Sequence, residues 1–297
     1  MSLHARLLSC LLLSLLPLAA VARDAAPAAD WRRQVADISA GHDTAGRAAA
    51  ITARLDRLGI AWQREPFSQD GQSGINLVAD LGGPEGAPLL LLGAHYDRVE
   101  IGHGATDNAS GVAAVIELAR ALHRQPLARH RARIVFWDLE EKGLLGSRAW
   151  VATPGRERPA LYVNFDVYGW GDTLWMMTLR QDDPLAAALR PLVAARGLQL
   201  VAGERYPPTD HLPFQRAGWP AVSFSRVEGT EIEGILQVFA GQQPATPPKV
   251  MQVIHSPGDT LAALDAAHLE ASVQVLEQAL RQWDRRGPAA AAPAASP

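Results

Sequence analysis

The residues best suited to chemistry in this sequence are histidines and carboxylates that directly follow apolar segments. His95 comes after the run LLLLG, and the adjacent pair Glu140 and Glu141 comes after IVFWDL. Asp166 ends the segment LYVNFD, and Asp107 stands in a loop that opens a predicted helix. A charged side chain at the end of a buried strand is poorly solvated, so each of these groups needs a partner.

A divalent metal ion is the partner that this combination of side chains favours. Histidine and carboxylate ligands without cysteine are typical of hydrolytic zinc sites. Two adjacent glutamates also allow one to bind metal while the other accepts a proton from water. Each residue alone has a structural alternative: a satisfied strand-end histidine, a solvated Glu-Glu pair, a helix cap or a turn aspartate. The joint pattern is what predicts a metal site.

The elements that must position these residues alternate between helical and extended patterns. Continuous apolar runs such as LLLLG indicate strands buried on both faces of a sheet. We therefore predict a single α/β domain with a central, mostly parallel mixed β-sheet flanked by helices on both faces. Residues that follow parallel strands converge on one edge of such a sheet. The predicted helices are 30–40, 44–58, 108–124, 184–196, 209–217 and 264–284, the predicted strands are 75–81, 89–93, 134–139, 161–165, 174–178 and 221–224, and 226–250 is predicted to be a long loop.

The two ends of the chain differ in composition from its middle. A weakly basic start, an apolar run over 7–18 and the small-residue sequence Ala20-Val21-Ala22 predict a signal peptide over residues 1–22. Residues 23–29 are predicted to be a flexible leader and 287–297 a disordered Ala/Pro tail. We therefore expect an exported protein, periplasmic or secreted, without stable membrane insertion after signal removal. The only cysteine, Cys10, lies in the predicted signal, which excludes a cysteine nucleophile in the mature chain.

Five segments together resemble the zinc-dependent aminopeptidase family that includes secreted bacterial double-zinc aminopeptidases, glutamate carboxypeptidase and the glutaminyl cyclases. The segments occur in family order between about residues 74 and 262. One H-x-D or Glu-Glu motif is not specific, but the five segments in order are. They are GAHYDRVEIGHGATDNASGVAAVIELARAL, FWDLEEKGLLGSRAW, YVNFDVYGWGD, PPTDHLPFQRAGWPAVSF and IHSPGDT. The resemblance implies a zinc peptidase domain over residues 30–286.

The resemblance also implies two zinc ions per chain and a ligand role for each matching residue. Asp107 would bridge the two ions. Glu141 and His255 would complete one metal site, and His95 and Asp166 would complete the other. The peptide bond that follows Asp107 would be cis.

Further residues receive roles around those ligands from the same resemblance. Glu140 would be the general base, which takes a proton from a metal-activated water and later delivers it to the leaving amine. Asp97 would orient the imidazole of His95 through a hydrogen bond. Asp210 would contact the substrate amine or support the ligands, with helix capping as an equal alternative, and Tyr206 would support the oxyanion or serve as a loop aromatic.

The predicted function is that of a zinc-dependent aminopeptidase, which hydrolyses the N-terminal peptide bond of peptides with a free N-terminus. In such an enzyme one ion and nearby carboxylates hold the α-amino group, so that only a chain end is accepted. The formal net charge of −3 gives no indication of nucleic-acid binding, and the sequence does not predict an oligomeric state.

Two alternatives stay open. One is a glutaminyl-peptide cyclase of the same fold, which shares the ligand types and would differ in pocket shape and metal count. The other is a non-catalytic metal-binding relative, which Glu140 disfavours because such a protein has no need of a base. The motifs G-x-S-x-G and H-E-x-x-H, which mark other hydrolases, are absent.

Overall fold

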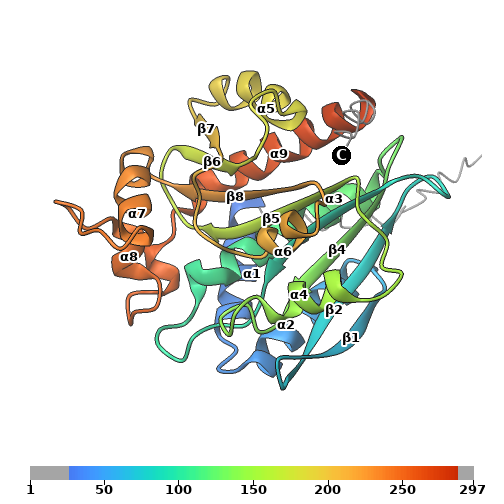
Figure 1. Cartoon of the computed structure of the whole chain (residues 1–297), viewed down its shortest axis with the longest axis horizontal. Coiled ribbons are helices and arrows are strands. Elements are labelled where there is room, and N and C mark those ends of the chain that lie inside the picture. The colour runs from blue at the N-terminus through green and yellow to red at the C-terminus, as the bar shows by residue number, and fades with distance from the viewer. Residues whose placement is uncertain (1–26, 287–297) are drawn as a thin grey trace, which may run out of the picture.

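One mixed β-sheet with helices on both faces forms the body of the protein (Figure 1). A computed structural model of the chain describes residues 27–286. The strand order is β1-β2-β4-β3-β5-β8-β6-β7, and the central strands β4, β3, β5 and β8 are parallel. β2 pairs antiparallel with β1 and β4, and β6 pairs antiparallel with β8 and parallel with β7. The strands are β1 (Trp62–Gln69), β2 (Gln72–Gly82), β3 (Leu89–His95), β4 (Arg131–Trp137), β5 (Leu161–Tyr168), β6 (Thr173–Met177), β7 (Gln199–Gly203) and β8 (Ala221–Val227).

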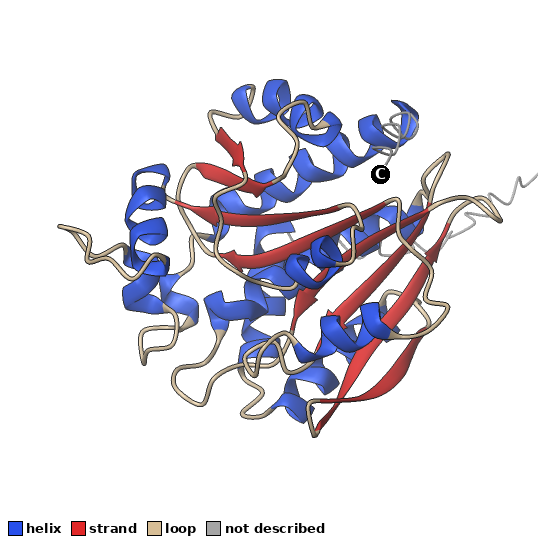
Figure 2. Cartoon of the chain, viewed as in Figure 1, coloured by secondary structure: helices blue, strands red, loops and turns tan. Residues whose placement is uncertain are grey.

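The helices form two unequal layers, seen as blue ribbons around the red sheet in Figure 2. Leu90 and Leu92 of β3 pack into the larger core, together with side chains of α1, α2, α3, α5 and α9. Leu91 points to the opposite face and packs with residues of α4 and α6, as the two-residue repeat of a strand requires. The helices are α1 (Pro27–Ser39), α2 (Thr44–Arg57), α3 (Ser110–Arg124), α4 (Leu145–Ala152), α5 (Pro184–Ala194), α6 (His211–Arg216), α7 (Ile232–Phe239), α8 (Lys249–Val253) and α9 (Ala266–Arg286).

The predicted fold class is confirmed, because the described residues form one mixed α/β domain with a parallel centre. Every predicted helix and strand has a counterpart within a few residues. Five helices and strands were not predicted, namely β1, β7, α4, α7 and α8. β1 was not predicted because it is an edge strand, where polar residues and Pro66 are tolerated.

The prediction of a long loop over 226–250 was wrong. This segment holds the end of β8, all of α7 and the start of α8. Ile232, Ile235, Leu236 and Phe239 recur at helical spacing, but Gly234 and the flanking Gln and Pro residues masked the pattern. α7 and α8 pack with Trp170, Trp175 and Val227 as a small cluster of their own, visible at the left of Figure 1 beyond the end of β8.

The predictions for the chain ends fall mostly outside the described residues. The signal peptide over 1–22 and the tail over 287–297 both lie there. Within the described part, α1 begins at Pro27, slightly before the predicted domain start at residue 30. No helix in the range 27–286 combines the length and the apolar character needed to cross a membrane.

Candidate metal centre

The strand ends bring the predicted site residues to one edge of the sheet. His95 is the last residue of β3, and Glu140 and Glu141 follow the neighbouring parallel strand β4. Asp166 lies near the end of β5, on the other side of β3. The carboxyl ends of adjacent parallel strands thus meet as the fold rule for α/β sheets predicts. Asp107 is supplied by the short turn before α3.

Two histidines and three carboxylates contact one another through shared atoms. Nε2 of His95 lies 3.1 Å from Oδ1 of Asp107 and 3.4 Å from Oδ1 of Asp166. Nε2 of His255 lies 3.2 Å from Oδ2 of Asp107 and 3.2 Å from Oε2 of Glu141. Asp107 therefore presents one oxygen to each histidine. The single hydrogen of an imidazole Nε2 cannot satisfy two carboxylates at once.

A divalent cation fits each of these groups better than a hydrogen does. Ligand atoms around a tetrahedral zinc ion, with bonds of about 2.0 Å, lie about 3.3 Å apart, which is close to the observed separations. Oε1 of Glu141 and Oδ1 of Asp166 are buried without a hydrogen-bond partner in the described part of the chain. Ligand atoms within 4.8 Å of one another define three groups: His95, Asp107 and Asp166; Asp107, Glu141 and His255; and His95, Glu140 and Glu141.

The pKa shifts in the cluster indicate that its carboxylates stabilise positive charge. Burial lowers the pKa of His95, but Glu140, Asp166 and Asp107 outweigh it and raise that pKa well above its usual value. Hydrogen bonds to Asp107 and Glu141 raise the pKa of His255 to about 10. Burial raises the pKa of the Glu140 carboxyl well above its ordinary value. Two divalent ions would supply four positive charges to the same carboxylates, whereas two imidazolium protons supply two.

Asp97 links the ligand His95 to the Glu140–Glu141 pair. One of its oxygens accepts the backbone N–H of Glu140 at 3.0 Å, and the other accepts that of Glu141 at 3.1 Å. Nδ1 of His95 lies 3.3 Å from Oδ1 of Asp97. This buried carboxylate therefore fixes the turn that carries the two glutamates and lies beside the imidazole, whose Nδ1 has no hydrogen-bond partner among the described residues.

Asp259 fastens the loop of His255 to the turn that carries Asp107. Its carboxylate accepts the backbone N–H groups of Thr106 at 2.6 Å and Asp107 at 3.2 Å. In return, the carbonyl of Asp259 accepts the N–H of His103 at 2.9 Å. The loop of His255 and the turn of Asp107, which lie far apart in sequence, are thereby held together. The peptide bond between Asp107 and the next residue is cis, which confirms that expectation.

Backbone strain is concentrated next to these residues. Leu139, directly before Glu140, Val167, directly after Asp166, and His255 itself all have positive φ angles, between 54° and 57°. Non-glycine residues rarely adopt this region, least of all a β-branched one such as Val167, and each instance costs about 1–3 kcal/mol. The fold tolerates this cost where it aims side chains at the site.

Tyr206 and Asp210 have distinct environments. The hydroxyl of Ser225 donates to the carbonyl of Asp166 at 2.6 Å, and the hydroxyl of Tyr206 lies 2.5 Å from Oγ of Ser225. The Tyr206 proton is therefore committed to Ser225. Asp210 is fully buried and accepts a hydrogen bond from Ser147 at 2.5 Å, while its Oδ2 lacks a partner among the described residues. Burial raises the pKa of Asp210 to about 7.

A cavity of about 430 Å³ opens onto the cluster. The proposed ligands and Glu140 line it together with apolar side chains, which form an apolar wall. Much of this apolar wall comes from α7, α8 and Ile254. α7 and the start of α8 lie in the segment 226–250, which was predicted to be a loop. Neither Lys nor Arg lines the cavity within the described residues. The apolar lining includes Trp175, Val227, Ile235, Phe239, Val250, Met251 and Ile254.

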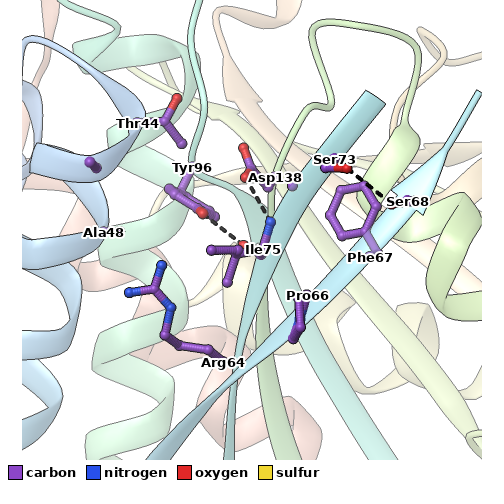
Figure 3. Close-up of a pocket in the computed structure, with 12 residues that line it drawn as sticks. Thr44, Ala48, Arg64, Pro66, Phe67, Ser68, Ser73, Ile75, Tyr96 and Asp138 are labelled. Atoms are coloured by element: carbon purple, nitrogen blue, oxygen red, sulfur yellow. Dashed lines mark hydrogen bonds between the residues drawn. The ribbon is translucent and has the colours of Figure 1, made fainter. Parts of the chain in front are cut away.

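A second cavity of about 640 Å³ lies behind the site, between α2 and the β1–β2 hairpin (Figure 3). The hydroxyl of Tyr96 donates to the carbonyl of Ile75 at 2.7 Å, and Asp138 accepts the N–H of the same residue at 2.9 Å. Neither the proposed ligands nor Glu140 line this cavity. The two hydrogen bonds to Ile75 connect the ends of β3 and β4 to β2, because Tyr96 directly follows β3 and Asp138 directly follows β4.

A parallel strand edge with paired His–carboxylate groups has the ligand types that are typical of hydrolytic metal sites in α/β proteins. A model of peptidase family M28 matches residues 76–280, and the chain belongs to this family, whose members hydrolyse peptide bonds. The chain is 33% identical over 211 residues to leupeptin-inactivating enzyme 1 of Streptomyces exfoliatus, which covers 67% of this chain and 48% of that protein. The chain spans about half or less of the length of the curated relatives it matches.

Two solved structures share the fold. A zinc aminopeptidase from Bacillus subtilis is 25% identical, with a TM-score of 0.56 over 71% of this chain and 50% of that one. A glutaminyl cyclase from Porphyromonas gingivalis is 22% identical, with a TM-score of 0.68 over 87% of this chain and 98% of that one. The similarity to the cyclase concerns the fold alone.

Proposed function

We propose that this protein is a zinc-dependent aminopeptidase that releases N-terminal residues from peptides. The observation that carries the proposal is the lining of the cavity. Asp107, Glu140, Glu141 and Asp166 line it, whereas Lys and Arg do not within the described residues. The carboxylates offer ligands and a base for metal-assisted hydrolysis, and two bound zinc ions would balance their charge. Because the lining includes no Lys or Arg side chain that would bind a C-terminal carboxylate, it supports cleavage at the N-terminus of a peptide.

The proposed ligands are His95, Asp107 and Asp166 for one zinc ion and Asp107, Glu141 and His255 for the other. Bound zinc would polarise the scissile carbonyl and lower the pKa of water at the site toward neutrality.

Residues of the chain perform the remaining steps. Glu140 accepts a proton from the attacking water and returns it to the departing amine. Asp97 keeps this glutamate in place, because it holds the backbone N–H on which the Glu140 turn depends. Together with one zinc ion, the carboxylates beside it would hold the free α-amino group of the substrate, so that cleavage would occur only at a chain end.

The apolar wall of the cavity supports a preference for peptides with an apolar N-terminal side chain. Ile235, Val250 and Ile254 offer no hydrogen-bonding side chain to a polar residue. We also propose that the chain is exported, on the strength of the residues 1–22 that resemble a signal peptide.

The decisive experiment compares two substrates on the zinc-loaded protein. Leucine para-nitroanilide tests the aminopeptidase reaction, and a peptide that begins with glutamine tests cyclisation. The proposal expects release of nitroaniline and, from the glutamine peptide, free glutamine without pyroglutamate. Formation of pyroglutamate without hydrolysis of the anilide would replace the proposal with a glutaminyl cyclase, and no turnover of either substrate would indicate a non-catalytic relative.

A further inference from the structure

Arg47 is a buried cation beside the candidate metal centre that receives no role from the catalytic proposal. It lies in the first turns of α2 and is fully shielded from solvent. The described residues include no ion-pair partner for it. A buried arginine without a carboxylate partner is expensive, and an apolar side chain would fill the same space at lower cost. Its retention therefore calls for a task that only a guanidinium performs.

The hydrogen bonds of Arg47 define that task. Its Nε donates to the carbonyl of Tyr96 at 2.6 Å, Nη1 donates to the carbonyl of His103 at 3.2 Å, and both Nη atoms donate to the carbonyl of Gly104 at 3.2 Å. Tyr96 directly follows His95, and Gly104 shortly precedes Asp107. One planar fork thus holds both ends of the loop that connects these two proposed ligands.

The turn at Gly104 transmits this constraint to Asp107. Gly104 has a left-handed backbone with φ of 59°, and a Cβ there would lie 2.8 Å from the carbonyl of Asp107 and 2.9 Å from Nη1 of Arg47. The carbonyl of Gly104 also accepts the N–H of Ala109 at 3.0 Å. The guanidinium is therefore packed directly against the turn that aims the proposed bridging carboxylate.

A second arginine holds the middle of the same loop. Nη1 of Arg98 donates to the carbonyls of Val99, Glu100 and Gly102 at 2.8–3.1 Å. These bonds organise the loop internally, and Nη2 of Arg98 donates to the carbonyl of His42, which lies just before α2. The bonds of Arg47 connect the two ends of the loop to α2 itself. Burial lowers the pKa of Arg47 to about 10, so the guanidinium remains charged at neutral pH, near the carboxylates of Asp97 and Asp107.

We propose that Arg47 is a positioning residue of the metal centre, which sets the separation of His95 and Asp107 by tying together the two ends of the loop between them. This inference rests on the proposed metal binding and does not depend on which reaction the protein catalyses.

The test compares Arg47→Met, Arg47→Lys and the control Arg54→Met. Arg54 lies on the same helix and pairs with Asp30 and Glu117, away from the candidate centre. The readouts are the zinc dissociation constant from competition with a chelator and the visible absorption spectrum of the Co²⁺-loaded protein, which reports ligand geometry. We expect Arg47→Met to weaken zinc binding by about 10- to 100-fold and to alter the cobalt spectrum. Arg54→Met should lower the melting temperature and leave both readouts unchanged.

Arg47→Lys keeps a cation but replaces the fork with a single ammonium group, which cannot reach both ends of the loop in the same way. Arg47→Lys should fold and bind zinc with an affinity between those of the wild type and Arg47→Met. If Arg47→Met yields no folded protein, the comparison of Arg47→Lys with the wild type is sufficient for the test. Wild-type zinc affinity and cobalt spectrum in whichever Arg47 variant folds would overturn the inference. A wild-type chain that binds zinc but hydrolyses no substrate would refute the proposed aminopeptidase activity and leave the role of Arg47 intact.

Discussion

Two regions of this protein pair histidine with aspartate, at opposite ends of the sheet, and only one of them has the properties of a metal site. At the amino end of β4, Nδ1 of His130 lies 2.9 Å from Oδ1 of Asp284 in α9. The carboxylate of Asp284 also accepts the N–H groups of Ala128 at 2.8 Å and Arg129 at 3.0 Å. The aspartate therefore has three hydrogen-bond donors and no competing carboxylate among its contacts.

At the carboxyl end of the same sheet, hydrogen-bond acceptors outnumber donors. The Nε2 atoms of His95 and His255 each face two carboxylates, and buried oxygens of Glu141 and Asp166 lack hydrogen-bond partners in the described part of the chain. A His–Asp contact is thus no indicator of a metal site by itself. What distinguishes the two regions is the ratio of acceptors to donors, because a surplus of buried acceptors calls for a cation.

The largest expected effect is a loss of turnover without a loss of zinc from the cluster at the carboxyl ends of the strands. Glu140→Gln should lower kcat by about 10²- to 10⁴-fold, because the amide cannot accept the proton of the attacking water. Zinc content should stay at the wild-type level, since the proposed ligand sets around Asp107 do not require Glu140. Full activity of this variant would remove Glu140 from the role of base, and loss of zinc would make it a ligand.

The next effect tests the comparison directly with one histidine from each region. His255→Ala should weaken binding of one zinc ion by at least about 100-fold, because it removes a proposed ligand from a set of three. The matched variant His130→Ala should retain wild-type zinc affinity and lose stability. Calorimetric zinc titration of both variants measures the difference. Equal zinc binding by wild type and His255→Ala would show that the ligand set is wrong.

Stability is the property that the amino-end pair should control. Asp284→Asn should destabilise the fold by about 2–3 kcal/mol, since it weakens charge-assisted hydrogen bonds to a buried group. Burial raises the pKa of Asp284, but the hydrogen bonds from His130 and the backbone outweigh it, so the folded-state pKa lies below the usual value. A depressed folded pKa stabilises the protein above the unfolded pKa near 4, and this stabilisation is lost as pH falls through the folded pKa. Thermal unfolding from pH 7 down to pH 3 should therefore show a deficit in Asp284→Asn that shrinks in acid, and a deficit independent of pH would contradict the assignment.

The smallest effect concerns Tyr206. Because the hydroxyl of Tyr206 is already bonded to Ser225, Tyr206→Phe should lower kcat by less than about tenfold and leave zinc binding unchanged. Steady-state kinetics on leucine para-nitroanilide measure this change. A loss of more than about 100-fold in kcat at constant KM would assign the hydroxyl to the oxyanion.

The sequence predicted those parts of the site that depend on strand ends. His95, Glu140 and Asp166 follow apolar strands, and parallel pairing alone brings such residues together. The helices that form the apolar wall of the cavity were not predicted, because helical periodicity in α7 is short and interrupted by Gly234. The contacts of Arg47 could not be predicted either. They join α2 to carbonyls of a distant loop, and a carbonyl leaves no signal in side-chain patterns.

The most direct test of the account is a zinc titration of wild-type protein that has first been stripped with a chelator. If the surplus of buried acceptors at the carboxyl ends of β3, β4 and β5 exists to hold cations, the protein should take up close to two zinc ions per chain, with a rise in melting temperature and a release of protons from the two histidines. Absence of zinc binding, with an unchanged melting temperature at saturating zinc, would contradict the account.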